Sequence, residues 1–148
     1  MRHATRSLVG ALIVALAVLP IGVHARAEEP VRVVVHLGHY TDDLHAASMA
    51  MSLATLLQKQ GAQVTLFLDR EGVRLVDARG PGDLAWGSGP SVVEAYQAFI
   101  GAGGSALVCA HCAHVAGLDP AKLRSGARIG DDASVAKLFL EASRVIDY

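Results

Sequence analysis

The chain has 148 residues, of which 52% are hydrophobic and 18% charged, and a formal net charge of −1 at pH 7. This charge balance provides no basic surface of the kind that phosphate backbones require, so we expect no binding to nucleic acid. The two cysteines, Cys109 and Cys112, are only three residues apart. A bridge across so short a loop removes little entropy from the unfolded chain, so disulfide stapling does not account for the pair.

Residues 1–27 are predicted to be a secretory signal peptide. Two arginines, Arg2 and Arg6, begin it, residues 7–23 form an apolar run, and residues 25–27 (ARA) form a small-x-small cleavage site. Cleavage after this site leaves 121 residues that carry 10 basic and 14 acidic side chains, a net charge of −4. We therefore expect a periplasmic or secreted protein that has no membrane association once the signal peptide is removed.

The part of the chain that remains, residues 28–148, is long enough for one domain with one core. Strands are expected over residues 31–37, 63–68, 105–109, 127–129 and 144–148, and helices over residues 45–60, 91–102, 109–116, 119–123 and 132–142. Glycine and proline interrupt residues 69–89, where only residues 73–76 indicate a short element. The alternation predicts an α/β fold: a three-layer α/β/α architecture with a mostly parallel sheet of about five strands.

The first predicted helix has a start signal and an apolar stripe. Asp42 or Asp43 is expected to cap its N-terminus rather than to act in acid–base chemistry. Four large apolar residues share one helical face and are expected to pack in the core: Met49, Leu53, Leu56 and Leu57.

The strongest chemical signal is residues 108–114 (VCAHCAH). Cys109 lies where a strand passes into a helix, so unpaired amide N–H groups and the positive end of the helix dipole favour its thiolate. His111, between the two cysteines, would stabilise a thiolate further. We expect Cys109 to be the nucleophile, assisted by Cys112 and His111, at the carboxyl edge of the sheet, where ligands of parallel α/β proteins bind.

A metal site is the alternative that uses the same segment. Thiolate and imidazole groups suit copper(I) or zinc. The candidate ligands are Cys109, Cys112 and His114, completed by His39 or His45 from the turn after the first strand. His36 is a further candidate, although its position inside a strand is typical of a core histidine. A single C-x-x-C provides only half of a zinc site, and no second C-x-x-C or H-x-x-x-H completes it in the sequence.

Four segments together resemble the DsrE-like sulfur-relay family, whose fold is also described as YchN-like. They are residues 31–37 (VRVVVHL), 64–76 (VTLFLDREGVRLV), 107–118 (LVCAHCAHVAGL) and 143–148 (SRVIDY). The resemblance implies a three-layer α/β/α domain that assembles as a homotrimer or homohexamer. It also implies a cysteine after the fourth structural strand that carries sulfur as a persulfide between partner proteins, and this position falls within residues 109–112.

The predicted export separates this chain from the cytoplasmic partners of a sulfur relay. Our leading hypothesis is an exported, DsrE-like, thiol-based sulfur carrier or thiol-exchange protein that needs no cofactor. Such a protein would serve an unidentified sulfur- or thiol-bearing partner and would be a carrier rather than an enzyme with its own turnover. Two alternatives stay open: a copper(I)- or zinc-binding module, and a non-catalytic oligomeric structural protein.

Overall fold

The computed structural model describes residues 29–148, so the predicted signal peptide lies outside the described residues. Within them, five strands form one sheet in the order β4-β3-β2-β1-β5, and every neighbouring pair is parallel. The strands are β1 Arg32–Leu37, β2 Gln63–Leu68, β3 Ser105–Cys109, β4 Ala127–Gly130 and β5 Arg144–Asp147. The helices are α1 Leu44–Lys59, α2 Val92–Gly101, α3 Ala110–Val115 and α4 Asp132–Glu141, with 3₁₀ helices η1 Arg70–Val76 and η2 Pro120–Lys122.

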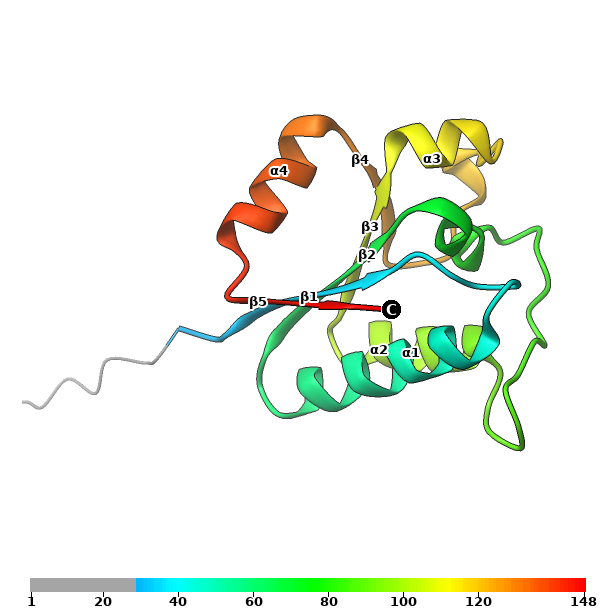
Figure 1. Cartoon of the computed structure of the whole chain (residues 1–148), viewed down its shortest axis with the longest axis horizontal. Helices are drawn as coiled ribbons and strands as arrows, with labels where there is room; N and C mark the ends of the chain where they lie inside the picture. Colours follow the sequence, from blue (N-terminus) through cyan, green and yellow to red (C-terminus); the bar gives the residue numbers. More distant parts are fainter. Residues whose placement is uncertain (1–28) are drawn as a thin grey trace, which may run out of the picture.

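The helices lie on both faces of the sheet, which confirms the predicted α/β architecture. In Figure 1, α1 and α2 lie below the sheet, α4 lies above it, and α3 lies at the end where β3 finishes. Among residues 29–148, no helix combines the length and the apolar character that a membrane span requires.

The helix starts follow from their capping residues. Asp43 accepts a hydrogen bond from the amide of Ala46 at 2.9 Å, and Ser91 forms a reciprocal capping box with Glu94. These side chains satisfy amide groups that the first turn of a helix leaves unpaired. The predicted boundaries of the strands and of the longer helices agree with the structure to within one or two residues. The short element expected over 73–76 extends back to residue 70 as η1.

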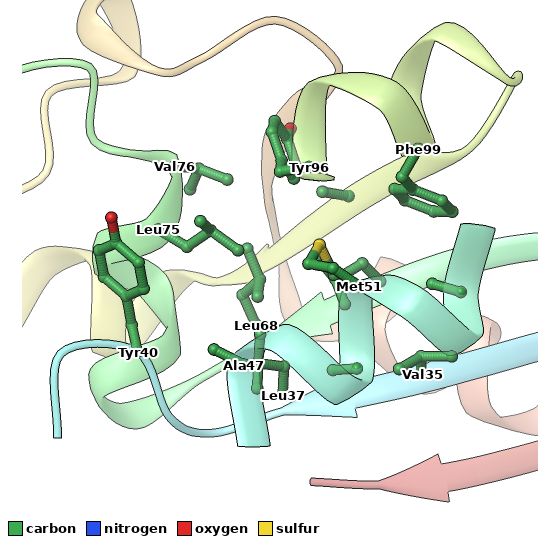
Figure 2. Packing of buried hydrophobic residues seen from close by; sticks show 14 of the residues in the cluster. Val35, Leu37, Tyr40, Ala47, Met51, Leu68, Leu75, Val76, Tyr96 and Phe99 are labelled. Atoms are coloured by element: carbon green, nitrogen blue, oxygen red, sulfur yellow. The ribbon is translucent and has the colours of Figure 1, made fainter. Parts of the chain in front are cut away.

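The main core lies between the sheet and the helices α1 and α2. Figure 2 shows Val35 and Leu37 of β1 and Leu68 of β2 packed against Ala47 and Met51 of α1. These side chains are essentially excluded from solvent. This packing is the principal hydrophobic contribution to folding.

The prediction of which face of α1 is buried was wrong for Met49, Leu53 and Leu56, whereas Leu57 packs against the main core as expected. Met49 and Leu56 are 42% and 55% exposed, and Leu53 and Leu57 are half-buried. The buried face consists instead of Ala47, Ala50, Met51 and Ala54. This set has the i, i+3, i+4, i+7 spacing of one helical stripe, and its small alanine side chains let the helix axis approach the sheet closely.

A smaller apolar cluster occupies the opposite face, under α4. Val34, Phe67 and Leu107 are its buried members. Phe67 meets Phe139 of α4 edge to face, with ring centroids 5.0 Å apart. Since α4 contributes no fully buried residue, this face is covered less completely than the face under α1 and α2.

The turn after β2 approaches the end of β1 backbone to backbone. The amide of Gly72 donates to the carbonyl of Gly38 at 3.1 Å. A Cβ atom added at Gly72 would lie 2.1 Å from the carbonyl oxygen of Leu37. Only glycine permits this approach, which sets η1 directly against the carboxyl end of β1.

We expect Gly72→Ala to lower the free energy of unfolding by about 1–3 kcal/mol, because backbone atoms must move apart to admit the methyl group. Gly82→Ala is the matched control, since a Cβ atom there meets nothing within 4 Å. The control should change stability by less than about 0.5 kcal/mol. Urea unfolding of both variants checks this, and equal midpoints for Gly72→Ala and the unmodified chain would contradict it.

Candidate functional site

Cys109 and Cys112 lie together at the carboxyl edge of the sheet. Cys109 is the last residue of β3 and the N-cap of α3, as expected, and its side chain makes no capping hydrogen bond. β3 is the third strand along the chain, whereas the resemblance implied a cysteine after the fourth. Both cysteines are free and half-buried. Cys109 packs against the smaller cluster and Cys112 against the main core, so the pair bridges the two faces of the sheet.

Burial raises the pKa of the Cys112 thiol. The backbone amide of Arg70 acts in the opposite direction, because it stabilises the thiolate. The neighbouring Cys109 thiol and the negative charge of Asp69 raise the pKa of Cys112 further. Cys112 is therefore held as a neutral thiol at neutral pH.

A pocket of about 320 Å³ opens between η1 and α3. Its lining includes Cys112 and His111 from α3 and Arg70, Glu71 and Arg74 from η1. Cys112 thus has a route to solvent, with arginine side chains at its mouth. His111 is exposed and lies on α3, the helix that also carries Cys112.

The residues proposed as metal ligands are not gathered within one chain. His39 bonds to Asp42 at 2.7 Å, and the ring of His45 stacks on Trp86 with centroids 4.1 Å apart. His114 is exposed on α3. In residues 29–148, no group of three or more His, Cys, Asp or Glu side chains is arranged to hold a metal ion. The structure therefore does not gather the ligand set expected for copper or zinc, Cys109 and Cys112 with these three histidines, within residues 29–148 of one chain, and the metal site stays a prediction.

Sequence reasoning missed an acidic pair around His36. The imidazole Nε2 bonds to Asp69 Oδ1 at 2.8 Å, and Nδ1 bonds to Asp147 Oδ1. His36 lies on the face that α4 covers and stands beside Phe67, with ring centroids 5.6 Å apart. The expectation of an ordinary core histidine was wrong, because the residue is half-buried and both of its ring nitrogens bond to carboxylates.

Arg70 links this acidic pair to the cysteines. It is the one non-glycine residue in the described part of the chain with a positive φ, 45°. A conformation of this kind costs on the order of 1 kcal/mol. Its Nε donates to Asp69 Oδ1 at 3.2 Å. A Cβ atom added at Gly38 would lie 2.1 Å from the Arg70 guanidinium, so glycine is required there for the side chain to lie over the end of β1.

A sequence signal for these residues existed. Asp69 directly follows β2 and Asp147 ends β5, and carboxyl ends of parallel strands meet at one edge. The strand order was needed to use this signal, because it places β5 beside β1 and β1 beside β2.

The sequence comparison with protein families agrees with this geometry. The model of the DsrE/DsrF-like family matches residues 32–148. The chain belongs to the DsrE/DsrF-like family. No curated protein sequence is similar enough to count as a match.

Two solved structures share the fold of this DsrE/DsrF-like chain. The YchN protein from E. coli superposes with a TM-score of 0.65 at 21% identity, over 80% of this chain and 99% of that chain. MTH1491, a protein of unknown function from Methanobacterium thermoautotrophicum, gives a TM-score of 0.63 at 16% identity over 80% and 99%. At such identities the likeness establishes the architecture alone.

We expect the apparent pKa of Cys112 to lie above the ordinary value for a thiol, because burial and two neighbouring groups outweigh the Arg70 amide. Iodoacetamide labelling across a pH series, read at the Cys112 peptide by mass spectrometry, measures it. Cys109→Ser removes one raising influence and should lower the pKa of Cys112 without restoring the ordinary value. An apparent pKa of Cys112 at or below that of free cysteine would contradict the assignment.

Proposed function

We propose that this chain is an exported DsrE-like thiol carrier that uses Cys109 and Cys112 to take up sulfur or to exchange thiols. The observation that carries the proposal is the proximity of the two thiols at the carboxyl edge of the sheet, where Cys109 raises the pKa of Cys112. Membership of the DsrE/DsrF-like family supports sulfur handling. The signal-peptide pattern of residues 1–27 supports export.

The two cysteines have different roles in this proposal. Cys112, whose pKa is raised, stays protonated and does not compete for an incoming group. Cys109 attacks first, at the junction of β3 and α3, and Cys112 then resolves the adduct. His111, which lines the same pocket as Cys112, assists by placing a cation-forming group near the thiolates.

Sulfur uptake from a persulfide donor proceeds by one displacement. The Cys109 thiolate attacks the outer sulfur of the donor, and a new sulfur–sulfur bond forms at Cys109. The bond between the two donor sulfurs breaks, and the donor thiolate leaves with the electron pair. A partner thiol removes the sulfur by the same reaction in reverse order, so the protein acts as a carrier and not as an enzyme with its own turnover.

Intact mass after incubation with inorganic polysulfide tests the carrier function. We expect a gain of one sulfur, about 32 Da, or a loss of two hydrogens, about 2 Da, when the pair closes to a disulfide. Cys112→Ser should accumulate the persulfide, because the resolving thiol is gone, and Cys109→Ser should show neither change. Sulfur uptake by Cys109→Ser equal to that of the unmodified chain would contradict the proposal. Labelling of Cys109 at mildly acidic pH no faster than that of free cysteine would also contradict it.

We also propose that the protein is a homotrimer or homohexamer. Large apolar side chains exposed on the single chain support assembly, since an interface between subunits would bury them. They are Val31, Met49, Leu56, Trp86, Val115, Leu140 and Val145. Native mass spectrometry at micromolar concentration should give three or six chains per particle, and a monomer would contradict this.

A further inference from the structure

The exposed residues of α1 form a single stripe along the helix, which we call the outer stripe. Its members are His45, Met49, Ser52, Leu56 and Lys59. Successive members alternate between four and three positions apart in the sequence, which is the repeat of a coiled-coil seam. Met49 and Leu56 are 42% and 55% exposed. The outer stripe therefore has the spacing with which one helix packs along another.

The outer stripe lacks the charges that a solvated helix face usually carries. Residues 44–58 contain no Asp, Glu, Lys or Arg, and the first such residue of α1 is Lys59 in its last turn. The exposed face of α4, in contrast, carries Asp132, Lys137 and Glu141. A helix at the surface of a soluble protein places charged and polar residues opposite its buried face. The composition of the outer stripe is therefore that of a contact surface.

A pocket of about 380 Å³ lies beside the outer stripe. Its lining comes from α1, from the start of α2 and from the segment before α2: Ser48, Met49, Ser52, residues 86–90 and Ala95. Trp86 in this lining is 51% exposed, and its ring stacks on His45. The same surface thus presents a projecting side chain, Leu56, and a hollow nearer the N-terminus of α1.

A two-fold axis at Ser52 matches the projection of one copy to the hollow of another. When two α1 helices run antiparallel about this axis, each residue lies opposite the one equally far from Ser52 in the other direction. Leu56 follows Ser52 by four residues and Ser48 precedes it by four, so Leu56 of the second copy lies opposite the pocket lining. This is the knob-into-hole packing of paired helices. The small side chain of Ser52 lets the two helices approach at the axis.

The charges at the two ends of the outer stripe also match across this axis. Lys59 of the second copy lies opposite His45, beside which Trp86 stacks and Asp42 is half-exposed. An ammonium group is attracted both to an indole ring and to a carboxylate. The antiparallel arrangement also sets the negative C-terminal end of each helix beside the positive N-terminal end of the other. A parallel arrangement would bring the two copies of Lys59 together, so the charges favour a second copy that runs antiparallel.

We propose that the outer stripe of α1 is a two-fold interface through which two copies of this chain meet antiparallel. Such a contact is isologous, because the same surface of both copies forms it. The inference adds a surface to the assembly proposed above. A hexamer built from two trimers needs two-fold contacts between the trimers, and α1 supplies them. The interface does not depend on the chemistry of Cys109 and Cys112, so it can fail or hold independently of the carrier function.

Disulfide trapping at the axis tests the geometry. Ser52→Cys is made in the chain that also carries Cys109→Ser and Cys112→Ser, so that the introduced thiols have no other cysteine to react with. These thiols face each other across the axis and should join two chains on oxidation at micromolar concentration. Ser143→Cys in the same background is the matched control, since Ser143 is exposed between α4 and β5. Linking through Ser52→Cys should be at least about tenfold faster, because thiols held together react at a high effective concentration.

Charge placed in the interface tests its contribution to assembly. Leu56→Glu directs one carboxylate of each copy at the hollow of the other, and burial of an unpaired charge is unfavourable. Native mass spectrometry should show that the number of chains per particle halves, from six to three. Circular dichroism should be unchanged, since Leu56 is 55% exposed in the single chain. Leu140→Glu is the control on α4, where Leu140 is 87% exposed, and it should leave the linking through Ser52→Cys unchanged.

The outcomes separate this interface from the proposals above. Linking through Ser52→Cys no faster than through Ser143→Cys would overturn the α1 interface. Six chains per particle in Leu56→Glu would overturn it as well. A particle of three unmodified chains would overturn the α1 interface and leave the trimer standing, whereas a monomer would overturn both. If Leu56→Glu loses its circular dichroism, the Ser52→Cys result decides, because that variant replaces a single side-chain atom.

Discussion

The site depends on the close approach between the turn after β2 and the end of β1. Gly72 can donate to the carbonyl of Gly38 because it carries no side chain that would meet the backbone of Leu37. Beside this contact the chain turns at Arg70, which takes a left-handed backbone conformation with φ 45°. The same turn directs the Arg70 amide at Cys112 and lays its guanidinium over Gly38. The strain at Arg70 is therefore part of how the cysteine environment is built.

Charge at the site is balanced around one carboxylate. Asp69 accepts from a histidine and an arginine, and its own negative charge opposes ionisation of Cys112. Any proton that moves at the cysteine pair changes the field that these partners feel, because the groups are close and partly shielded from solvent. Asp69 thus connects His36 on β1 to Arg70 at the turn beside the cysteine pair.

Most of the fold could be predicted from the sequence because its signals are local. The β-branched run before Leu37, the capping aspartate at residue 43 and the capping box at Ser91 each identify an element from nearby residues. The buried face of α1 could not be chosen in this way. That helix carries one stripe of large apolar residues and another built mainly on alanine, and only the closeness of the sheet selects the smaller one.

The candidate site likewise contains residues that local sequence signals identify and residues that only the tertiary structure brings together. Residues 109–112 were chosen as the candidate site because three of these four consecutive positions, Cys109, His111 and Cys112, carry reactive side chains, and because a strand end beside a helix start is visible in the sequence. Asp69, Arg70 and Asp147 come from segments more than 30 residues away from the cysteines or from His36. They meet only through the strand order that sets β5, β1, β2 and β3 side by side. The two histidines expected to complete a metal site do not join the cysteines for the matching reason: His39 bonds to Asp42 and His45 stacks on Trp86.

The position of the pair between two unequal cores has a consequence for its chemistry. Cys112 packs on the main core, which is closed by α1 and α2, whereas Cys109 packs on the cluster under α4. Because α4 contributes no fully buried residue, the cluster beneath it is covered less completely than the main core. The function proposed above needs one thiol that a reagent can reach and one that stays in place. The unequal packing supports this division of roles, because Cys109 lies against the less completely covered cluster and Cys112 lies against the main core.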